Sequence, residues 1–158
     1  GRVKMSVNGN MYEVTLNETW DLFGAHLDGA HAALVCVLSA KPLEERGCTA
    51  LRSSADALGY GRDACTFIAL DAGDGSLLDE QALFLLMEGL DPVCLVAADN
   101  DAAEALGRAY RCSVETGKAN HVFGRTCIAF RDFDAMLDDG QDKQIAWALL
   151  KKLPKFGD

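Results

Sequence analysis

Four short apolar segments recur along the chain, separated by stretches in which apolar residues return at helical spacing among polar ones. The apolar segments occupy residues 32–39, 65–70, 93–98 and 125–130. Uninterrupted apolar runs of this length are typical of strands buried on both faces of a parallel sheet. Strands that alternate with helices predict an α/β fold, namely a three-layer sandwich around a central, mainly parallel, four-stranded sheet.

The stretches between these segments are predicted to be helices. In residues 43–58 the apolar positions recur every three to five residues, and Gly59 follows as a helix stop. A helix over residues 77–90 ends before Asp91-Pro92, because the residue before a proline disfavours helical backbone. Further helices are predicted for about residues 100–110 and 141–153, with an irregular segment at 112–122.

The first sixteen residues show a different pattern. Residues 2–7 and 11–16 alternate imperfectly between apolar and polar side chains on either side of Asn8-Gly9, a pair that favours a tight hairpin turn. We therefore predict a β-hairpin appendage in residues 1–16, followed by a short helix capped by Asn17. No linker or internal repeat interrupts the remainder, so residues 1–158 are expected to form a single domain.

Composition narrows the classes of partner. Hydrophobic residues make up 49% of the chain, which excludes a disordered protein. The formal net charge is −9, and Lys and Arg supply most of the affinity for phosphates, so duplex DNA is disfavoured as a partner although not excluded. No apolar run approaches the roughly 18 residues that span a bilayer, and no membrane partner is expected.

The cysteines indicate a reducing environment. None of the six belongs to a C-x-x-C pair, which leaves metal and redox motifs without support. Four of them lie within the predicted strands, as expected of free cysteine acting as a small core residue. We expect reduced, buried thiols, no metal, no cofactor and a cytoplasmic location. The six are Cys36, Cys48, Cys65, Cys94, Cys112 and Cys127.

Acidic residues gather in the loops that follow the second and fourth predicted strands. Asp71 and Asp74 follow one strand, and Asp132, Asp134, Asp138 and Asp139 follow the other. In open α/β sheets such loops meet at the carboxyl edge, where ligands bind, and carboxylates there could hold a hard cation such as Mg²⁺. Acidic loop residues are more often turn formers and solvated charge, and we predict no metal site.

Several segments also match a known family in order and spacing. The exit of the first strand reads Ser39-Ala40-Lys41-Pro42, and the third strand runs into an alanine-rich helix over residues 93–103. Phe130-Arg131-Asp132 follows the fourth strand, and the last helix ends in Lys151-Lys152-Leu153. Over about residues 32–153 the chain resembles the uracil-DNA glycosylase superfamily, in particular its small bacterial and archaeal iron–sulfur branch. The resemblance implies the α/β fold of that family.

The resemblance also implies which positions would carry the chemistry, and these positions differ here. Ala40 stands where the family has the carboxylate that handles the attacking water, and Ala69 stands where an asparagine reads the edge of uracil. Arg131 replaces the histidine that stabilises the developing uracil anion, and Asp132 replaces the proline after it. No cysteine precedes Cys36, so the iron–sulfur cluster of the branch is not expected. The same alignment thus implies the fold and argues against glycosylase activity.

A residual pocket is expected where these segments meet. Arg131 is a candidate for anion stabilisation, because a guanidinium can serve as a histidine does, and Asp132 or Asp71 could act with it. Phe130 aligns with the aromatic residue before the family's histidine and is a candidate for stacking. The expected pocket residues are Ser39, Ala40, Lys41, Pro42, Ala69, Phe130 and Arg131.

Three functions remain open at this point. The first is a domain with the glycosylase fold but without its chemistry, which binds a nucleotide-like ligand, nucleic acid or a protein partner. The second is a remodelled glycosylase or hydrolase that acts on a nucleobase-containing substrate through Arg131 with Asp132 or Asp71. The third is a structural module that oligomerises through the hairpin of residues 1–16, because an exposed strand edge can pair with another chain.

Overall fold

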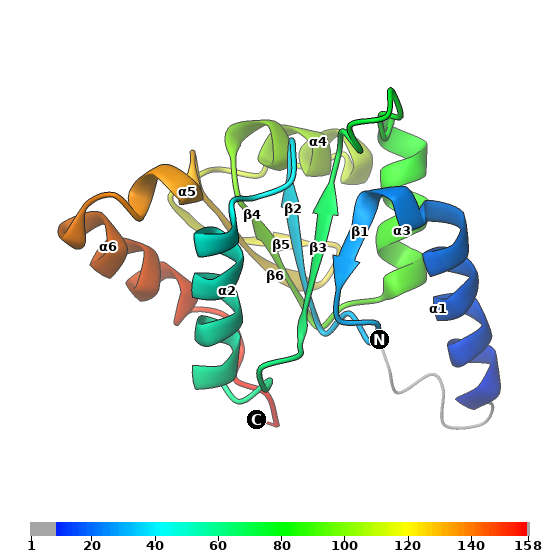
Figure 1. The fold of residues 1–158 in the computed structure, drawn as a ribbon, viewed down its shortest axis with the longest axis horizontal. Helices are drawn as coiled ribbons and strands as arrows, with labels where there is room; N and C mark the ends of the chain where they lie inside the picture. Colours follow the sequence, from blue (N-terminus) through cyan, green and yellow to red (C-terminus); the bar gives the residue numbers. More distant parts are fainter. Residues whose placement is uncertain (1–8, 158) are drawn as a thin grey trace.

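A six-stranded mixed sheet forms the centre of the molecule (Figure 1). The computed structural model describes residues 9–157, with side chains from residue 15 onward. The strands are β1 (Leu27–Gly29), β2 (Val35–Ser39), β3 (Cys65–Ala69), β4 (Cys94–Ala97), β5 (Lys118–Val122) and β6 (Arg125–Ala129). Across the sheet they follow the order β1-β3-β2-β4-β6-β5.

The four central strands are the four apolar segments of the sequence. β2 pairs in parallel with β3 on one side and β4 on the other, and β4 pairs in parallel with β6. The predicted strand count of four was wrong, because β1 and β5 add an antiparallel strand at each edge. These edge strands read Leu-Asp-Gly and Lys-Ala-Asn-His-Val, so neither has the continuous apolar run of a buried strand.

Helices cover both faces of the sheet. They are α1 (Gly9–Phe23), the 3-10 helix η2 (Gly24–His26), α2 (Glu45–Ala57), α3 (Glu80–Leu90), α4 (Asn100–Tyr110), α5 (Phe133–Met136) and α6 (Gly140–Leu150). Val35 and Val37 of β2 join a hydrophobic cluster with α2, α5 and α6, whereas Cys36 and Leu38 join a second cluster with α1, α3 and α4. None of the described helices is long and apolar enough to cross a bilayer.

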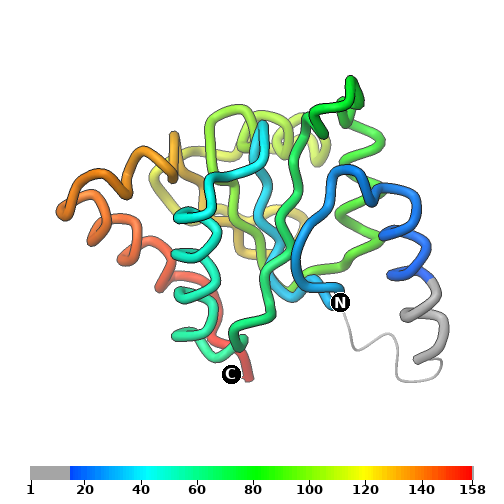
Figure 2. Tube along the Cα trace, in the orientation of Figure 1, coloured from blue at the N-terminus to red at the C-terminus, as the bar shows by residue number. Residues whose placement is uncertain are grey.

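The N-terminal hairpin was wrongly predicted. Residues 11–16, its second strand, belong to helix α1, and residues 2–7 lie outside the described residues. The local Asn-Gly turn signal is overridden by packing, because Leu16 is buried in the cluster that also contains Leu83 and Leu86 of α3. Figure 2 shows the described part of α1 running beside α3. Within the described residues, a packed helix therefore stands where the second strand of a hairpin was expected.

A glycine allows α1 to approach α3 closely. A Cβ atom placed on Gly89 of α3 would lie only 2.1 Å from the Thr19 Oγ1 atom and 3.1 Å from its Cβ. The Thr19 hydroxyl is itself held in place, because it donates a hydrogen bond to the Thr15 carbonyl at 2.8 Å. The contact between the two helices thus depends on the missing side chain at Gly89.

A buried ion network joins the amino end of β6 to the end of α3. The Arg125 guanidinium contacts the Glu88 carboxylate at 2.7 Å and the Asp91 carboxylate at 2.8 Å. Its Nε donates to the Pro92 carbonyl, and the Tyr110 hydroxyl of α4 donates to Glu88 at 2.6 Å. The Arg125 and Asp91 side chains are only 12% and 4% exposed, so losing either would leave a buried charge uncompensated.

Five of the six cysteines are buried, and four of these lie in the sheet as predicted. The expectation of buried thiols was wrong for Cys112, which follows α4 and is exposed. Burial raises the pKa of the Cys94 thiol to about 11, and it raises the pKa of Cys65 and of Cys127 to about 12. These thiols are therefore protonated and inert near neutral pH.

We expect Gly89→Ala to lower the free energy of unfolding by about 1–3 kcal/mol, because its methyl group collides with Thr19. Gly140→Ala is the matched control, since a Cβ there meets nothing within 4 Å, and it should be neutral or slightly stabilising. Adding Thr19→Ala to Gly89→Ala should recover part of the loss. Urea denaturation of the parent protein, the two single variants and the double variant measures these differences. Equal stability of Gly89→Ala and Gly140→Ala would contradict the close approach of α1 and α3.

We also expect one thiol of the native protein to react rapidly with dithiobis(nitrobenzoic acid) near neutral pH, namely Cys112. The Cys112→Ser variant should lose the fast phase, while all remaining thiols react once the protein is unfolded in urea. A fast phase that persists in Cys112→Ser would show that one of the sheet cysteines is accessible.

Candidate functional site

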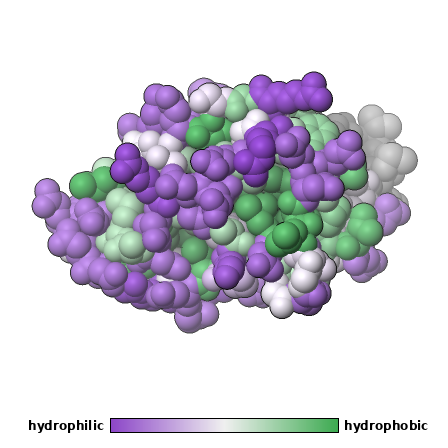
Figure 3. Space-filling model, turned by 90° about the horizontal axis from the view of Figure 1, so that it is seen from above, coloured by the Kyte–Doolittle hydropathy of each residue, from purple (hydrophilic) through white to green (hydrophobic). Residues whose placement is uncertain are grey.

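The loops that follow the four parallel strands meet at one edge of the sheet, the carboxyl edge. Figure 3 looks down on this edge, where hydrophilic side chains cover most of the surface. Backbone hydrogen bonds connect neighbouring loops: the Asp71 N–H donates to the Ala40 carbonyl at 2.9 Å, and the Asn100 N–H donates to the Arg131 carbonyl at 3.1 Å. The predicted site residues are thereby arranged in a row that follows the order of the strands.

The topological switch point of the sheet lies between β2 and β4. From β2 the chain passes to β3 on one side, and it then returns across β2 to reach β4 on the other. Ligands of open α/β sheets bind in the crevice that opens where two such loops diverge. Ala40, just after β2, and Asp99, shortly after β4, lie on the two sides of this switch point.

The Asp99 carboxylate joins the loops on the two sides of the switch point. Its Oδ2 accepts a hydrogen bond from the Ala40 backbone N–H at 2.9 Å, and its Oδ1 accepts from the Ala102 N–H at 2.8 Å as the N-cap of α4. Because each oxygen accepts from a backbone donor, Asp99 links the loop after β2 to the first turn of α4.

Arg131 and Asp132 lie next to Asp99 on the row of loops. Both side chains are exposed, and the Asp132 Oδ1 accepts from the Ala135 N–H at 3.1 Å as the N-cap of α5. Three strand spacings separate β6 from β3, which puts the loops of Arg131 and Asp71 roughly 14 Å apart. Asp132 is therefore a nearer partner for Arg131 than Asp71 is.

A shallow pocket of about 460 Å³ lies at the carboxyl edge between the loops after β2 and β3. We refer to it as the edge pocket. Lys41 and Pro42 line one side, and Asp71 and Leu77 line the other, so three of the predicted residues meet here. The Asp71 Oδ1 accepts from the Gly73 N–H at 2.8 Å, which holds its loop in a turn. The edge pocket combines one cation, one carboxylate and two apolar side chains.

Ser39, Ala69 and Phe130 lie beneath this edge, each at most 7% exposed. The Ser39 hydroxyl donates to the backbone carbonyl two residues further on, and His26 Nδ1 donates to the Ala69 carbonyl at 2.7 Å. Phe130 packs against Phe133 with 5.1 Å between ring centroids. In this conformation these three residues support the loops from below, and their roles in ligand binding stay predictions.

Acidic residues along this edge serve as helix caps. Asp79, Asp99, Asp132 and Asp139 each accept from the backbone N–H three residues further on. Such caps also place a negative charge at the positive end of each helix. Among the side chains of residues 15–157, no group of three or more histidine, cysteine or acidic residues could hold a metal ion.

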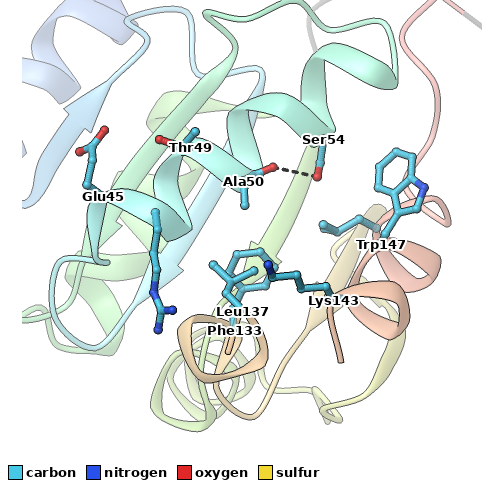
Figure 4. Close-up of a pocket in the computed structure, with 11 residues that line it drawn as sticks. Glu45, Thr49, Ala50, Ser54, Phe133, Leu137, Lys143 and Trp147 are labelled. Carbon is cyan, nitrogen blue, oxygen red and sulfur yellow. Dashed lines mark hydrogen bonds between the residues drawn. The ribbon is translucent and has the colours of Figure 1, made fainter. Parts of the chain in front are cut away.

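A larger hollow of about 680 Å³ lies on one face of the sheet, between α2 and the pair α5–α6 (Figure 4). Ala50, Phe133, Leu137 and Trp147 supply mainly apolar walls, and Lys143 extends into it from α6. We refer to this hollow as the helix groove. Sequence reasoning missed it, although Lys143 and Trp147 are one turn apart and so share a face of the last helix.

Comparisons with known proteins do not assign the chain to a family. Neither the protein-family models nor the curated proteins compared with it match. The relationship to uracil-DNA glycosylases therefore remains a prediction from the sequence, and the function has to be argued from the geometry of the site.

We expect Asp99→Ala to destabilise the protein by about 2–3 kcal/mol, because it removes the N-cap of α4 and the bond to Ala40 together. Asp79→Ala, which removes the cap of α3 alone, should cost about 1 kcal/mol. Asp99→Asn keeps one acceptor oxygen, so its loss of stability should fall between those of Asp79→Ala and Asp99→Ala. Urea denaturation compares them, and equal losses in the two alanine variants would mean that the bond to Ala40 contributes nothing.

Proposed function

We propose that the chain is a binding domain with a uracil-DNA glycosylase-like fold, which holds a nucleoside- or nucleotide-like ligand at its carboxyl edge without cleaving it. The observation that carries this proposal is the 2.9 Å hydrogen bond from the Ala40 N–H to the Asp99 carboxylate. It joins the two loops of the crevice in which a glycosylase-like reaction would take place.

The side chains at the working positions support binding over catalysis. Ala40 and Ala69 carry no group that could activate water or read the edge of a base, and a general base typically contributes ~10²–10⁴-fold to a rate. Their backbone groups are also engaged, the Ala40 N–H with Asp99 and the Ala69 carbonyl with His26. Asp99, whose carboxylate accepts from the Ala40 N–H, already holds the loop after β2 and the start of α4 through its two oxygens.

The edge pocket offers contacts that suit a nucleoside. The Asp71 carboxylate accepts from amino and hydroxyl groups, the Lys41 ammonium donates to a carbonyl or a single phosphate, and Pro42 and Leu77 give apolar contact to a ring. A nucleobase attached to a sugar presents these groups together. The net charge of −9 disfavours a long run of phosphates, so a mononucleoside or mononucleotide suits the pocket better than duplex DNA.

A remodelled hydrolase is the second candidate, and the adjacency of Arg131 and Asp132 favours it. Both side chains are exposed, and charge that develops beside a solvated guanidinium is stabilised less than in a closed site. Oligomerisation through the hairpin has lost its basis, because residues 11–16 are helical. The sheet edges available to a partner strand are those of β1 and β5.

We expect no base excision from uracil-containing single- or double-stranded oligonucleotides, or from a panel of other damaged bases. In calorimetry with uridine, UMP, adenosine and AMP, at least one should bind, and Asp71→Ala or Lys41→Ala should weaken that binding about tenfold. Asp63→Ala, an exposed aspartate in the turn before β3, is the matched control and should leave the affinity unchanged.

Arg131→Ala separates the two candidate functions. In a binding domain it leaves the affinity for the nucleoside nearly unchanged, since Arg131 lies away from the edge pocket. Base excision or nucleoside hydrolysis that disappears in both Arg131→Ala and Asp132→Ala would overturn the proposal in favour of the hydrolase.

A further inference from the structure

We propose that the helix groove binds a small amphipathic anion, a molecule with an apolar body and one anionic head group that pairs with Lys143. The groove lies between helices on one face of the sheet, whereas the edge pocket lies among the loops after β2 and β3. The proposal is therefore independent of the function proposed for the carboxyl edge.

The dimensions and walls of the groove suit such a ligand. Its volume of about 680 Å³ lies within the ~300–1,000 Å³ that is usual for small-molecule sites. Phe133 belongs to α5, and Leu137 directly follows this helix. Ala50 belongs to α2 and Trp147 to α6 (Figure 4). Three separate elements thus form an apolar cradle with an aromatic ring at one side.

The charged groups around the groove are satisfied with one exception. Arg46 is paired with Glu44 at 2.9 Å and with Asp138 at 2.6 Å, and Glu45 contacts Arg52 at 3.4 Å.

Lys143 makes no ion pair with any residue that the structure describes. Its side chain extends into the groove (Figure 4). The pKa of Asp138 is lowered mainly by its hydrogen bond to Arg46 and least by the charge of Lys143. The main partner of Asp138 is therefore Arg46 and not Lys143. The groove therefore presents an available ammonium group beside apolar walls.

A second cation lies on the same face of α6. Lys143, Trp147 and Lys151 follow one another at intervals of four residues, and the Lys151 ammonium lies 5.8 Å from the centroid of the Trp147 ring. In a protein of net charge −9, two lysines on either side of a partly buried aromatic ring form a local positive stripe. Low-dielectric walls next to such charges strengthen their attraction for an anion. This complementarity favours an anionic occupant over a neutral or cationic one.

Trp147 provides the measurement. The chain has two tryptophans, so Trp20→Phe leaves Trp147 as the only indole. We expect its fluorescence to change saturably with decanoate below the micellar concentration, and to respond much less to decanol or decyltrimethylammonium, which share the apolar tail. Circular dichroism verifies that the Trp20→Phe background is folded.

In that background, Lys143→Gln should weaken decanoate binding about tenfold, whereas Lys152→Gln, an exposed lysine that does not line the groove, should not change it. Ala50→Leu should weaken decanoate and decanol alike, because it fills the groove without removing charge. Equal affinity for decanoate and decanol, no effect of Lys143→Gln, or no response to decanoate would each overturn the proposal. Nucleoside binding at the edge pocket should be the same in Lys143→Gln as in the parent protein, which keeps the two proposals distinguishable.

Discussion

One carboxylate, that of Asp99, holds together the loops on which the carboxyl edge depends. Parallel strands at a switch point send their chains in opposite directions, so the sheet itself does not join the loops after β2 and β4. Asp99 joins them by accepting from the Ala40 N–H while it caps α4. Asp99 thereby engages the backbone N–H of Ala40, the residue before Lys41 of the edge pocket.

The central strands could be predicted because a strand that is buried on both faces leaves a short, continuous apolar run in the sequence. β1 and β5 could not, because half-exposed edge strands of three and five residues carry polar side chains. Helix α1 was mistaken for a hairpin because the Asn-Gly signal is local. The packing of Leu16 and Thr19 against α3 is a tertiary contact that only the folded chain reveals.

The candidate site was predictable to the extent that it follows strand order. Lys41, Pro42 and Asp71 share a pocket because neighbouring parallel strands end side by side. Phe130 directly follows a strand and packs against Phe133, since the direction of a side chain reverses at each step along a strand, and its role in ligand binding stays a prediction. The helix groove combines residues 45–54 with residues 133–150, and no pattern in either segment indicates that the two lie next to each other.

The Arg125 network makes one part of the molecule open as a unit. Its partners Glu88, Asp91 and Tyr110 belong to α3, its end and α4, so β6 cannot separate from these helices without exposing several buried charges together. An opening that exposes the amides of this region has to break these contacts together. Helices α5 and α6 lie outside the network. Motion of these two helices would change the shape of the helix groove, which they line together with α2, without breaking the Arg125 network.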